Sequence, residues 1–353
     1  MELIGAIAAN DENRVRELLA EGEDVNQTDK RGMTPLIRAA FGDKRDLVRL
    51  FIEAGADVNA VGPHGVTPIF QVAAHGDVEN VELLLRCGAD ARHKNERGEG
   101  VLHGLESQNL AVRFALLSLL IAAGANPNSS NNYGHPDLFA PFIYYLGERD
   151  TFHSQQIFDL LDQHNFDFRR VVDGQNLLHL AGHYNCLDGA RLLVERQIID
   201  IESRGELGKT ALHLATGQNH DGMIRFLISV GADIEARDAK GQTPIFMAED
   251  LPFWKERGAN INARDNQGKT VLMHCCSLPN APRPVDTNRM SPESAAQHQM
   301  SQVMFQAKVE KAVTKTRQLL QLGADASVRD NQGFSALDFA VQSQQETLIS
   351  LLQ

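Results

Sequence analysis

Apolar residues recur along the chain in short runs with helical spacing, and many of these runs stop at a glycine. The pairs Leu84-Leu85 and Leu319-Leu320 each end three residues before a glycine, and Val81 precedes the first pair at helical spacing. Because glycine takes up the left-handed conformation at little cost, it marks the end of such a helix. The pattern therefore predicts an all-α protein built from short helices, each with one apolar face.

Two short sequence motifs recur at regular positions relative to these helices. A turn glycine introduces a Thr-Pro-Leu-type segment nine times, at successive separations of 33, 33, 36, 40, 34, 33, 27 and 65 residues. About 21 residues after the threonine position stands a Gly-Ala-Asp or Gly-Ala-Asn step, as at Gly55, Gly88 and Gly231. Thr34-Pro35 and Thr243-Pro244 place a capping side chain before a proline at the first helical position. Each period thus predicts one turn and two helices. The turn glycines are Gly32, Gly65, Gly98, Gly134, Gly174, Gly208, Gly241, Gly268 and Gly333.

The sequence resembles the ankyrin repeat family over essentially its full length. The resemblance is carried by DKRGMTPLIRAA from Asp29, LVRLFIEAGADVNA from Leu47, GKTALHLA from Gly208 and DAKGQTPIFMA from Asp238. It implies an ankyrin-repeat solenoid, in which each unit has a finger-like turn, two antiparallel helices and a loop, and the units stack side by side.

Each unit can bury its apolar face only against its neighbours, so we expect residues 1–353 to form a single domain. Within it, the pattern predicts an N-terminal capping unit over residues 1–28 and repeats over 29–278. An insertion follows over 279–310, and residues 311–353 complete that repeat and form a C-terminal capping repeat.

Composition and charge narrow the class of function. The chain is 42% hydrophobic and 23% charged, as expected of a folded soluble protein, and its net charge of −12 has the wrong sign for nucleic-acid or anionic-membrane binding. Four cysteines without framework spacing favour a reduced, cytoplasmic setting, with secretion into a host cell without a classical signal as the alternative. We expect no secretory signal and no membrane-spanning segment.

The unit from Gly134 departs from the repeat because it is long and rich in aromatic residues. One interpretation is that bulky rings fill an irregular core. The other is an aromatic cluster for a partner, with Tyr144 and Tyr145 as its exposed members. The rings are Tyr133, Phe139, Phe142, Tyr144, Tyr145, Phe152, Phe158, Phe166 and Phe168.

The unit from Gly241 is six residues short. The spacing predicts that its second helix is a stub that begins near Pro252 and carries Trp254. For Trp254 we weigh a packing role against direct contact with a partner.

The unit from Gly268 carries about 32 extra residues. After an irregular opening, Ser291-Pro292 predicts the start of a helix that continues to Gln321 and projects beyond the stack. Met300, Val303, Met304 and Ala307 fall on one face of it. One interpretation is that these side chains pack back onto neighbouring helices. The other is that they form a face that binds a partner. Residues 279–322 carry a net +3, which leaves −15 on the rest of the chain.

Candidate chemistry is sparse. His179, His183 and Cys186 have metal-like spacing, but His179 is the histidine of the repeat motif, and Cys275-Cys276 stand where the repeat has two alanines. We therefore expect a structural role for these side chains, no metal site, no cofactor and no catalytic activity.

The leading hypothesis is a protein–protein interaction module that binds through finger turns, first helices and the insertion. The array is acidic, so we expect a protein partner with a basic surface, no nucleic acid, no membrane insertion and a monomeric state. Alternatives are a bacterial effector that binds a host protein, and an enzyme or enzyme-regulating subunit with its site near the insertion. The predicted partner-binding residues are Lys30, Arg31, His64, Glu96, Arg97, Tyr144, Tyr145, Lys240, Trp254, Gln267, Met300, Met304, Lys308 and Lys311.

Overall fold

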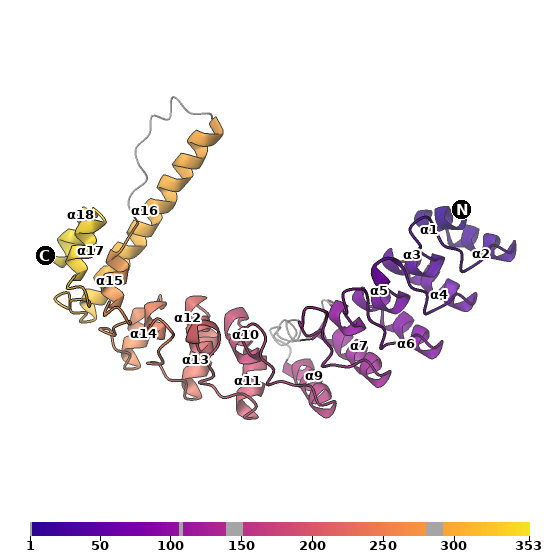
Figure 1. The fold of residues 1–353 in the computed structure, drawn as a ribbon, viewed down its shortest axis with the longest axis horizontal. Coiled ribbons are helices and arrows are strands. Elements are labelled where there is room, and N and C mark those ends of the chain that lie inside the picture. The colour runs from indigo at the N-terminus through magenta and orange to yellow at the C-terminus, as the bar shows by residue number, and fades with distance from the viewer. Residues whose placement is uncertain (1, 106–108, 139–150, 280–291) are drawn as a thin grey trace. The chain divides into compact units, whose positions relative to one another are not determined.

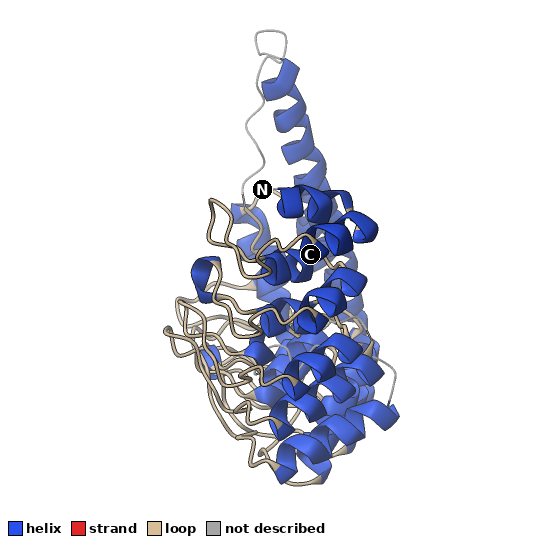
Figure 2. Cartoon of the chain, turned by 90° about the vertical axis from the view of Figure 1, so that its right-hand side faces the viewer, coloured by secondary structure: helices blue, strands red, loops and turns tan. Residues whose placement is uncertain are grey.

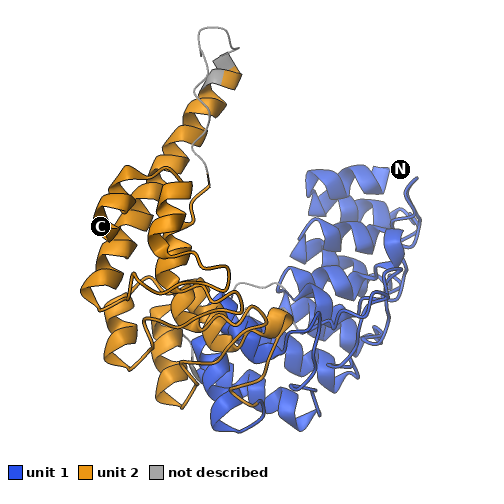
Figure 3. Ribbon diagram, turned by 60° about the vertical axis from the view of Figure 1, so that its left-hand side comes forward, with its two compact units in different colours: residues 1–199 blue, residues 200–353 orange. Residues whose placement is uncertain are grey.

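The computed structural model describes residues 2–105, 109–138, 151–279 and 292–353. Its internal contacts group the chain into two compact units, Met1–Ile199 and Asp200–Gln353, each of which is described by itself (Figure 3). Within the described residues the structure has 17 α-helices, four 3₁₀ helices and no strand (Figure 2). The predicted all-α repeat fold is confirmed, whereas a single domain over the whole chain stays a prediction.

Unit 1 contains pairs of short helices (Figure 1). Its α-helices are α1 (Glu2–Ala9), α2 (Glu12–Ala20), α3 (Pro35–Phe41), α4 (Arg45–Glu53), α5 (Pro68–Ala74), α6 (Val78–Arg86), α7 (Leu110–Ala122), α9 (Thr151–Gln163), α10 (Leu177–Tyr184) and α11 (Leu187–Glu195). Its 3₁₀ helices are η1 (Pro63–Gly65) and η2 (Val101–Gly104).

Unit 2 continues the same alternation and contains one much longer helix. Its α-helices are α12 (Ala211–Gly217), α13 (Asp221–Ser229), α14 (Leu251–Glu256), α15 (Val271–Cys276), α16 (Pro292–Gln321), α17 (Ala336–Gln342) and α18 (Glu346–Leu352). Its 3₁₀ helices are η3 (Glu206–Gly208) and η4 (Pro244–Phe246).

Each helix pair packs on the next pair of its unit. In unit 1, α3 contacts its partner α4 and the neighbouring first helices α1 and α5, while α6 contacts α4 and α7. In unit 2, α15 contacts α16 and α17, and α18 contacts α16 and α17. Leu36, Leu47 and Leu84 are among the side chains that this stacking buries completely. The core is therefore a continuous layer between successive pairs within a unit.

The predicted helix boundaries are confirmed where the motif is complete. Thr34 accepts a hydrogen bond from the Ile37 amide at 3.3 Å through its Oγ1, and Pro35 occupies the first turn of α3. At the other end of the repeat, Gly55 and Gly88 have φ values of 83° and 88° and so adopt the left-handed conformation that stops a helix.

The short unit from Gly241 loses residues from both of its helices, because its first helix is only the 3₁₀ turn η4 and its second is the six-residue α14. Trp254 is 2% exposed and packs edge-to-face on Phe253. The prediction that Trp254 contacts a partner is therefore wrong. The indole instead belongs to the buried interior of unit 2.

The aromatic-rich unit divides between core and surface. Phe158 stacks on Phe168 with ring centroids 4.3 Å apart, Phe166 meets Phe168 edge-to-face, and all three are buried. The core interpretation is confirmed for these rings, whereas Tyr133 and Phe152 are exposed. Phe139, Phe142, Tyr144 and Tyr145 lie outside the described residues.

The predicted long helix is confirmed as α16. It begins at Pro292 and runs without interruption to Gln321. Its C-terminal half packs on α15 and α18 through side chains that include Ala312, Thr316 and Leu319. Its N-terminal half extends away from the other helices of unit 2 (Figure 1).

In several repeats a single side chain closes the finger turn. Asp238 Oδ1 accepts hydrogen bonds from the Lys240 amide at 2.8 Å and the Gln242 amide at 2.9 Å. Gly241 follows at φ 74°, and a Cβ there would overlap the side chain of Asn266 in the next finger. The last finger has the same turn at Gly333, with φ 88°, but no atom lies within 4 Å of a Cβ built there.

We predict that Gly241→Ala lowers the free energy of unfolding by about 1 kcal/mol more than Gly333→Ala does. Both substitutions force a side chain into the left-handed region, at about 1–2 kcal/mol, but only the first also displaces Asn266 from its hydrogen bonds. Urea denaturation of both variants measures the difference. Equal losses would mean that contact between neighbouring fingers adds nothing to the cost.

His213 links two repeats of unit 2. Its Nδ1 accepts from the Thr210 amide at 3.2 Å, and its Nε2 donates to the Gln242 carbonyl of the next finger at 3.1 Å. The side chain is fully buried, and burial lowers the pKa of His213. The folded state therefore favours the neutral ring.

We predict that the free energy of unfolding falls as the pH drops below about 6.5, because the unfolded chain then binds a proton at His213 that the folded chain excludes. One such group contributes a slope of at most about 1.4 kcal/mol per pH unit. Urea denaturation at pH 7 and pH 5.5 should give a shallower slope for His213→Gln than for the wild type. An identical slope would contradict the assignment.

Candidate partner-binding surfaces

Successive finger tips are tied together through their backbones. In unit 1 the Glu96 amide donates to the His64 carbonyl at 3.0 Å, and the Asn132 amide donates to the Arg97 carbonyl at 2.8 Å. In unit 2 the Asn266 amide donates to the carbonyl of Lys240 at 2.9 Å. The turns thus form a hydrogen-bonded ladder within each unit that fixes the backbone of every tip it joins.

The side chains of these tips remain available. All seven predicted finger residues are exposed. Among them, His64 Nδ1 lies 3.8 Å from a Glu96 carboxylate oxygen. A fixed backbone with free side chains suits recognition, because less conformational entropy is lost on binding. The seven are Lys30, Arg31, His64, Glu96, Arg97, Lys240 and Gln267.

The N-terminal half of α16 exposes apolar side chains. Met300, Val303 and Met304 are 62%, 60% and 58% exposed, and Ala307 is also exposed. The interpretation in which the methionines pack back onto neighbouring helices therefore does not describe this structure. We call residues 292–308 of α16 the arm.

The positive charge of the insertion is partly used inside unit 2. Lys311 forms an ion pair with Glu249 at 2.6 Å, and this hydrogen bond lowers the pKa of Glu249. Lys315 is half-buried, and burial lowers its pKa. Lys308 is exposed at the end of the arm, and Arg283 and Arg289 lie outside the described residues. The net +3 therefore overstates the charge that this part of the surface offers.

Two nitrogen-bearing side chains on first helices, Arg38 and His274, pair with the residue that closes their own finger. Arg38 donates from Nη2 to Asp29 Oδ2, and this bond lowers the pKa of Asp29. His274 lies 2.8 Å from Asp265 Oδ2. Burial alone would raise the pKa of Asp265, but hydrogen bonds, the strongest from His274, bring it below its usual value. Sequence reasoning missed these pairs, although Arg38 and His274 each stand nine residues after the finger acid.

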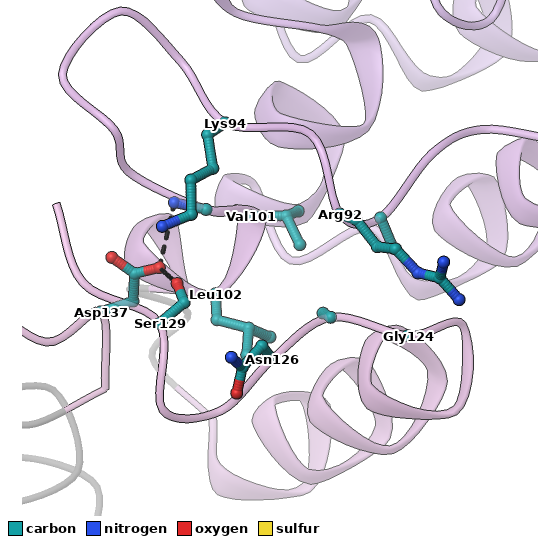
Figure 4. Close-up of a pocket in the computed structure, with 11 residues that line it drawn as sticks. Arg92, Lys94, Val101, Leu102, Gly124, Asn126, Ser129 and Asp137 are labelled. Atoms are coloured by element: carbon teal, nitrogen blue, oxygen red, sulfur yellow. Dashed lines mark hydrogen bonds between the residues drawn. The ribbon is translucent and has the colours of Figure 1, made fainter.

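A cavity of about 230 Å³ in unit 1 lies between residues 91–102 and the loop after α7 (Figure 4). Its wall includes Asp137, which is completely buried and accepts hydrogen bonds from Ser129 Oγ and, at 3.0 Å, from the Gly100 amide. Gly100 stands at the threonine position of its repeat, and a Cβ there would come within 2.8 Å of Asp137 Oδ2. Because Gly100 has no side chain, there is room for Asp137 of the next repeat, and this carboxylate therefore joins two repeats.

We predict that Asp137→Ala lowers the free energy of unfolding by about 1–3 kcal/mol, since the Gly100 amide loses its acceptor. Gly100→Thr, which restores the residue usual in the repeat, should also destabilise the protein because it collides with Asp137. The loss of unfolding free energy in the double variant should be about 1 kcal/mol smaller than the sum of the losses in the two single variants. Strictly additive losses in urea denaturation would contradict the proposed exchange of roles.

The histidine and cysteine residues that the sequence offers as candidate metal ligands or reactive groups lie among the packed helices. His179 is 1% exposed and accepts a hydrogen bond from the Asn176 amide at 3.2 Å, as expected for local bonding. Cys276 is buried, and burial raises its pKa to about 12. Across the described ranges, no three His, Cys, Asp or Glu side chains gather as a metal ion would require. None of the helices in that part of the chain has both the length and the apolar character needed to cross a membrane.

Comparisons with known proteins match this pattern. A family model described as ankyrin repeats (3 copies) matches residues 3–95 and 108–238. A transient receptor potential cation channel subfamily A member 1 homolog from Caenorhabditis elegans is 32% identical over 96 residues, which are 27% of this chain and 8% of that protein. Alpha-latrocrustotoxin-Lt1a from Latrodectus tredecimguttatus is 30% identical over 92 residues, 26% of this chain and 6% of the toxin. Human neurogenic locus notch homolog protein 1 is 35% identical over 79 residues, 22% of this chain and 3% of that protein. The chain thus spans less than a tenth of the length of each of these relatives.

Proposed function

Because the chain belongs to the ankyrin repeat family, whose repeats are in general protein–protein interaction modules, we propose that it binds a partner protein through its finger tips, its first helices and the arm of α16. The partner presents a basic surface to the acidic repeats and an apolar groove to the arm. The observation that carries this proposal is the exposed methionine face of the arm.

The arm is held as a helix by its continuity with an anchored segment. A short helix is marginal in water by itself, but the arm extends from a buried helical segment that includes Ala312, Thr316 and Leu319. Its length is therefore maintained without covering Met300 and Met304. Methionine is flexible and polarisable, which suits a helix that docks into a partner's groove.

The finger tips supply the second half of the proposed surface. The hydrogen-bonded ladders fix the backbones of the tips that they join, and the exposed side chains differ in charge from tip to tip. Such a row of different side chains gives specificity through charge complementarity more than through buried area. The net charge of −12 also speeds association with a basic partner and makes binding weaken with salt.

We predict that replacing both methionines, in Met300→Ser/Met304→Ser, reduces capture of a partner at least tenfold without changing the melting temperature. The loss follows from removing two exposed apolar contacts that a groove would bury. The immobilised full chain and the variant are compared by pull-down from the native cell extract with quantitative mass spectrometry.

The control is Gln302→Ser/Gln306→Ser, which changes two exposed positions of the same arm outside the predicted methionine face. The proposal requires a protein that the wild type and this control retain and that the methionine variant loses. If every retained protein binds all three chains equally, the arm is not the contact.

A further inference from the structure

A second cavity, of about 320 Å³, lies beside the first finger of unit 1. It is lined by Ile4 of α1, by residues 27–31 and by Arg38 of α3. Three of the lining side chains are cations, Lys30, Arg31 and Arg38, and one is the carboxylate of Asp29. We call this cavity the first-finger notch.

The only carboxylate of the notch is already engaged. Asp29 Oδ1 accepts from the Arg31 amide at 2.8 Å and from the Met33 amide at 3.0 Å. Its Oδ2 accepts from Arg38. One carboxylate therefore balances one of three cations, and it does so from within the fold.

The three cations of the first-finger notch have donors or charge that this carboxylate does not satisfy. The Nε of Arg38 is buried and has no hydrogen-bond partner, although a buried guanidinium donor ordinarily has one. Lys30 and Arg31 are exposed and form no ion pair with any described residue. The tip of the next finger, residues 62–65, carries no carboxylate that would neutralise them.

We propose that the first-finger notch binds a carboxylate side chain of an acidic peptide segment in the partner. Arginine donors match a carboxylate in geometry and charge. Ile4 adds an apolar wall for the methylene groups that carry the carboxylate. This inference rests on the proposed protein-binding function and specifies the chemistry that one end of the surface recognises.

The acidity of the whole chain does not oppose this local preference. At an ionic strength of about 0.1 M, interactions between exposed charges are screened beyond about 10 Å. A carboxylate in the notch therefore responds to the two unpaired cations beside it rather than to the net charge of −12. The partner then combines a basic surface for the other repeats with an acidic segment for the notch.

The test measures binding of a fluorescein-labelled 12-residue peptide, rich in Glu with two Ile residues, to the full chain by fluorescence anisotropy at 0.1 M salt. A peptide with every Glu replaced by Gln should bind at least tenfold more weakly. Arg31→Gln should weaken the acidic peptide about fivefold, and Lys30→Gln/Arg31→Gln about twentyfold, as expected for the loss of one and two exposed charge contacts.

Lys240→Gln is the matched control, since Lys240 occupies the position of Arg31 in a finger of unit 2 and the substitution removes one positive charge. It should leave the affinity for the acidic peptide within twofold of the wild type. Equal weakening by Arg31→Gln and Lys240→Gln, or equal binding of the Glu and Gln peptides, would overturn the proposal. So would Arg31-dependent binding of a single-stranded 12-nucleotide oligomer in place of the peptide.

The arm variant separates this inference from the proposed function. Met300→Ser/Met304→Ser should bind the acidic peptide as the wild type does, because the arm and the notch belong to different units. If the peptide fails to bind while the arm-dependent partner is still captured, only the notch is refuted. If both fail, the protein-binding function fails with it.

Discussion

Closure of the finger turn by one acidic or amide side chain is the interaction on which the architecture depends. Asp238 accepts two backbone amides of its own turn, and Asn95 and Asp330 do the same in theirs. This bond saturates the inner side of the turn and leaves the outer amides and carbonyls facing the neighbouring finger. In several fingers these groups pair with the neighbouring finger, as the Asn266 amide does with the Lys240 carbonyl, and the pairing fixes the position of one finger relative to the next. Local closure thus determines how repeats stack within a unit.

The same arrangement separates stability from recognition. The residues that hold the turns are the Asp or Asn and the left-handed glycine, whereas the two residues between them project into solvent. Substitution of the second of these two residues changes the surface without touching the ladder, whereas the first, as at Asn266, also donates a side-chain hydrogen bond to the neighbouring finger. Arg38 is a partial exception, because it belongs to the fold through Asp29 and also lines the first-finger notch. A residue with both roles is where we expect recognition and stability to be coupled.

The periodic features were predictable from the sequence because they depend on local chemistry. Thr34 caps its own helix, and α16 spans the predicted residues because nothing between Pro292 and Gln321 breaks a helix. Trp254 was misjudged because its burial depends on the packed interior of unit 2, which no local pattern encodes. The contact between Asp137 and Gly100 joins residues 37 positions apart in two repeats that depart from the repeat motif, so the sequence of neither repeat predicts it.

The finger tips and the arm differ in the physics by which each would bind a partner. A tip has a fixed backbone and a charged side chain, so it loses little entropy and discriminates by charge. The arm has a regular backbone but flexible methionines, so it adapts its shape and gains free energy from apolar burial. The ion pair of Lys311 with Glu249 lies just C-terminal to the arm, at its junction with the buried segment. The described part of the insertion is therefore a helix that is anchored at its C-terminal end and exposes apolar side chains in the arm.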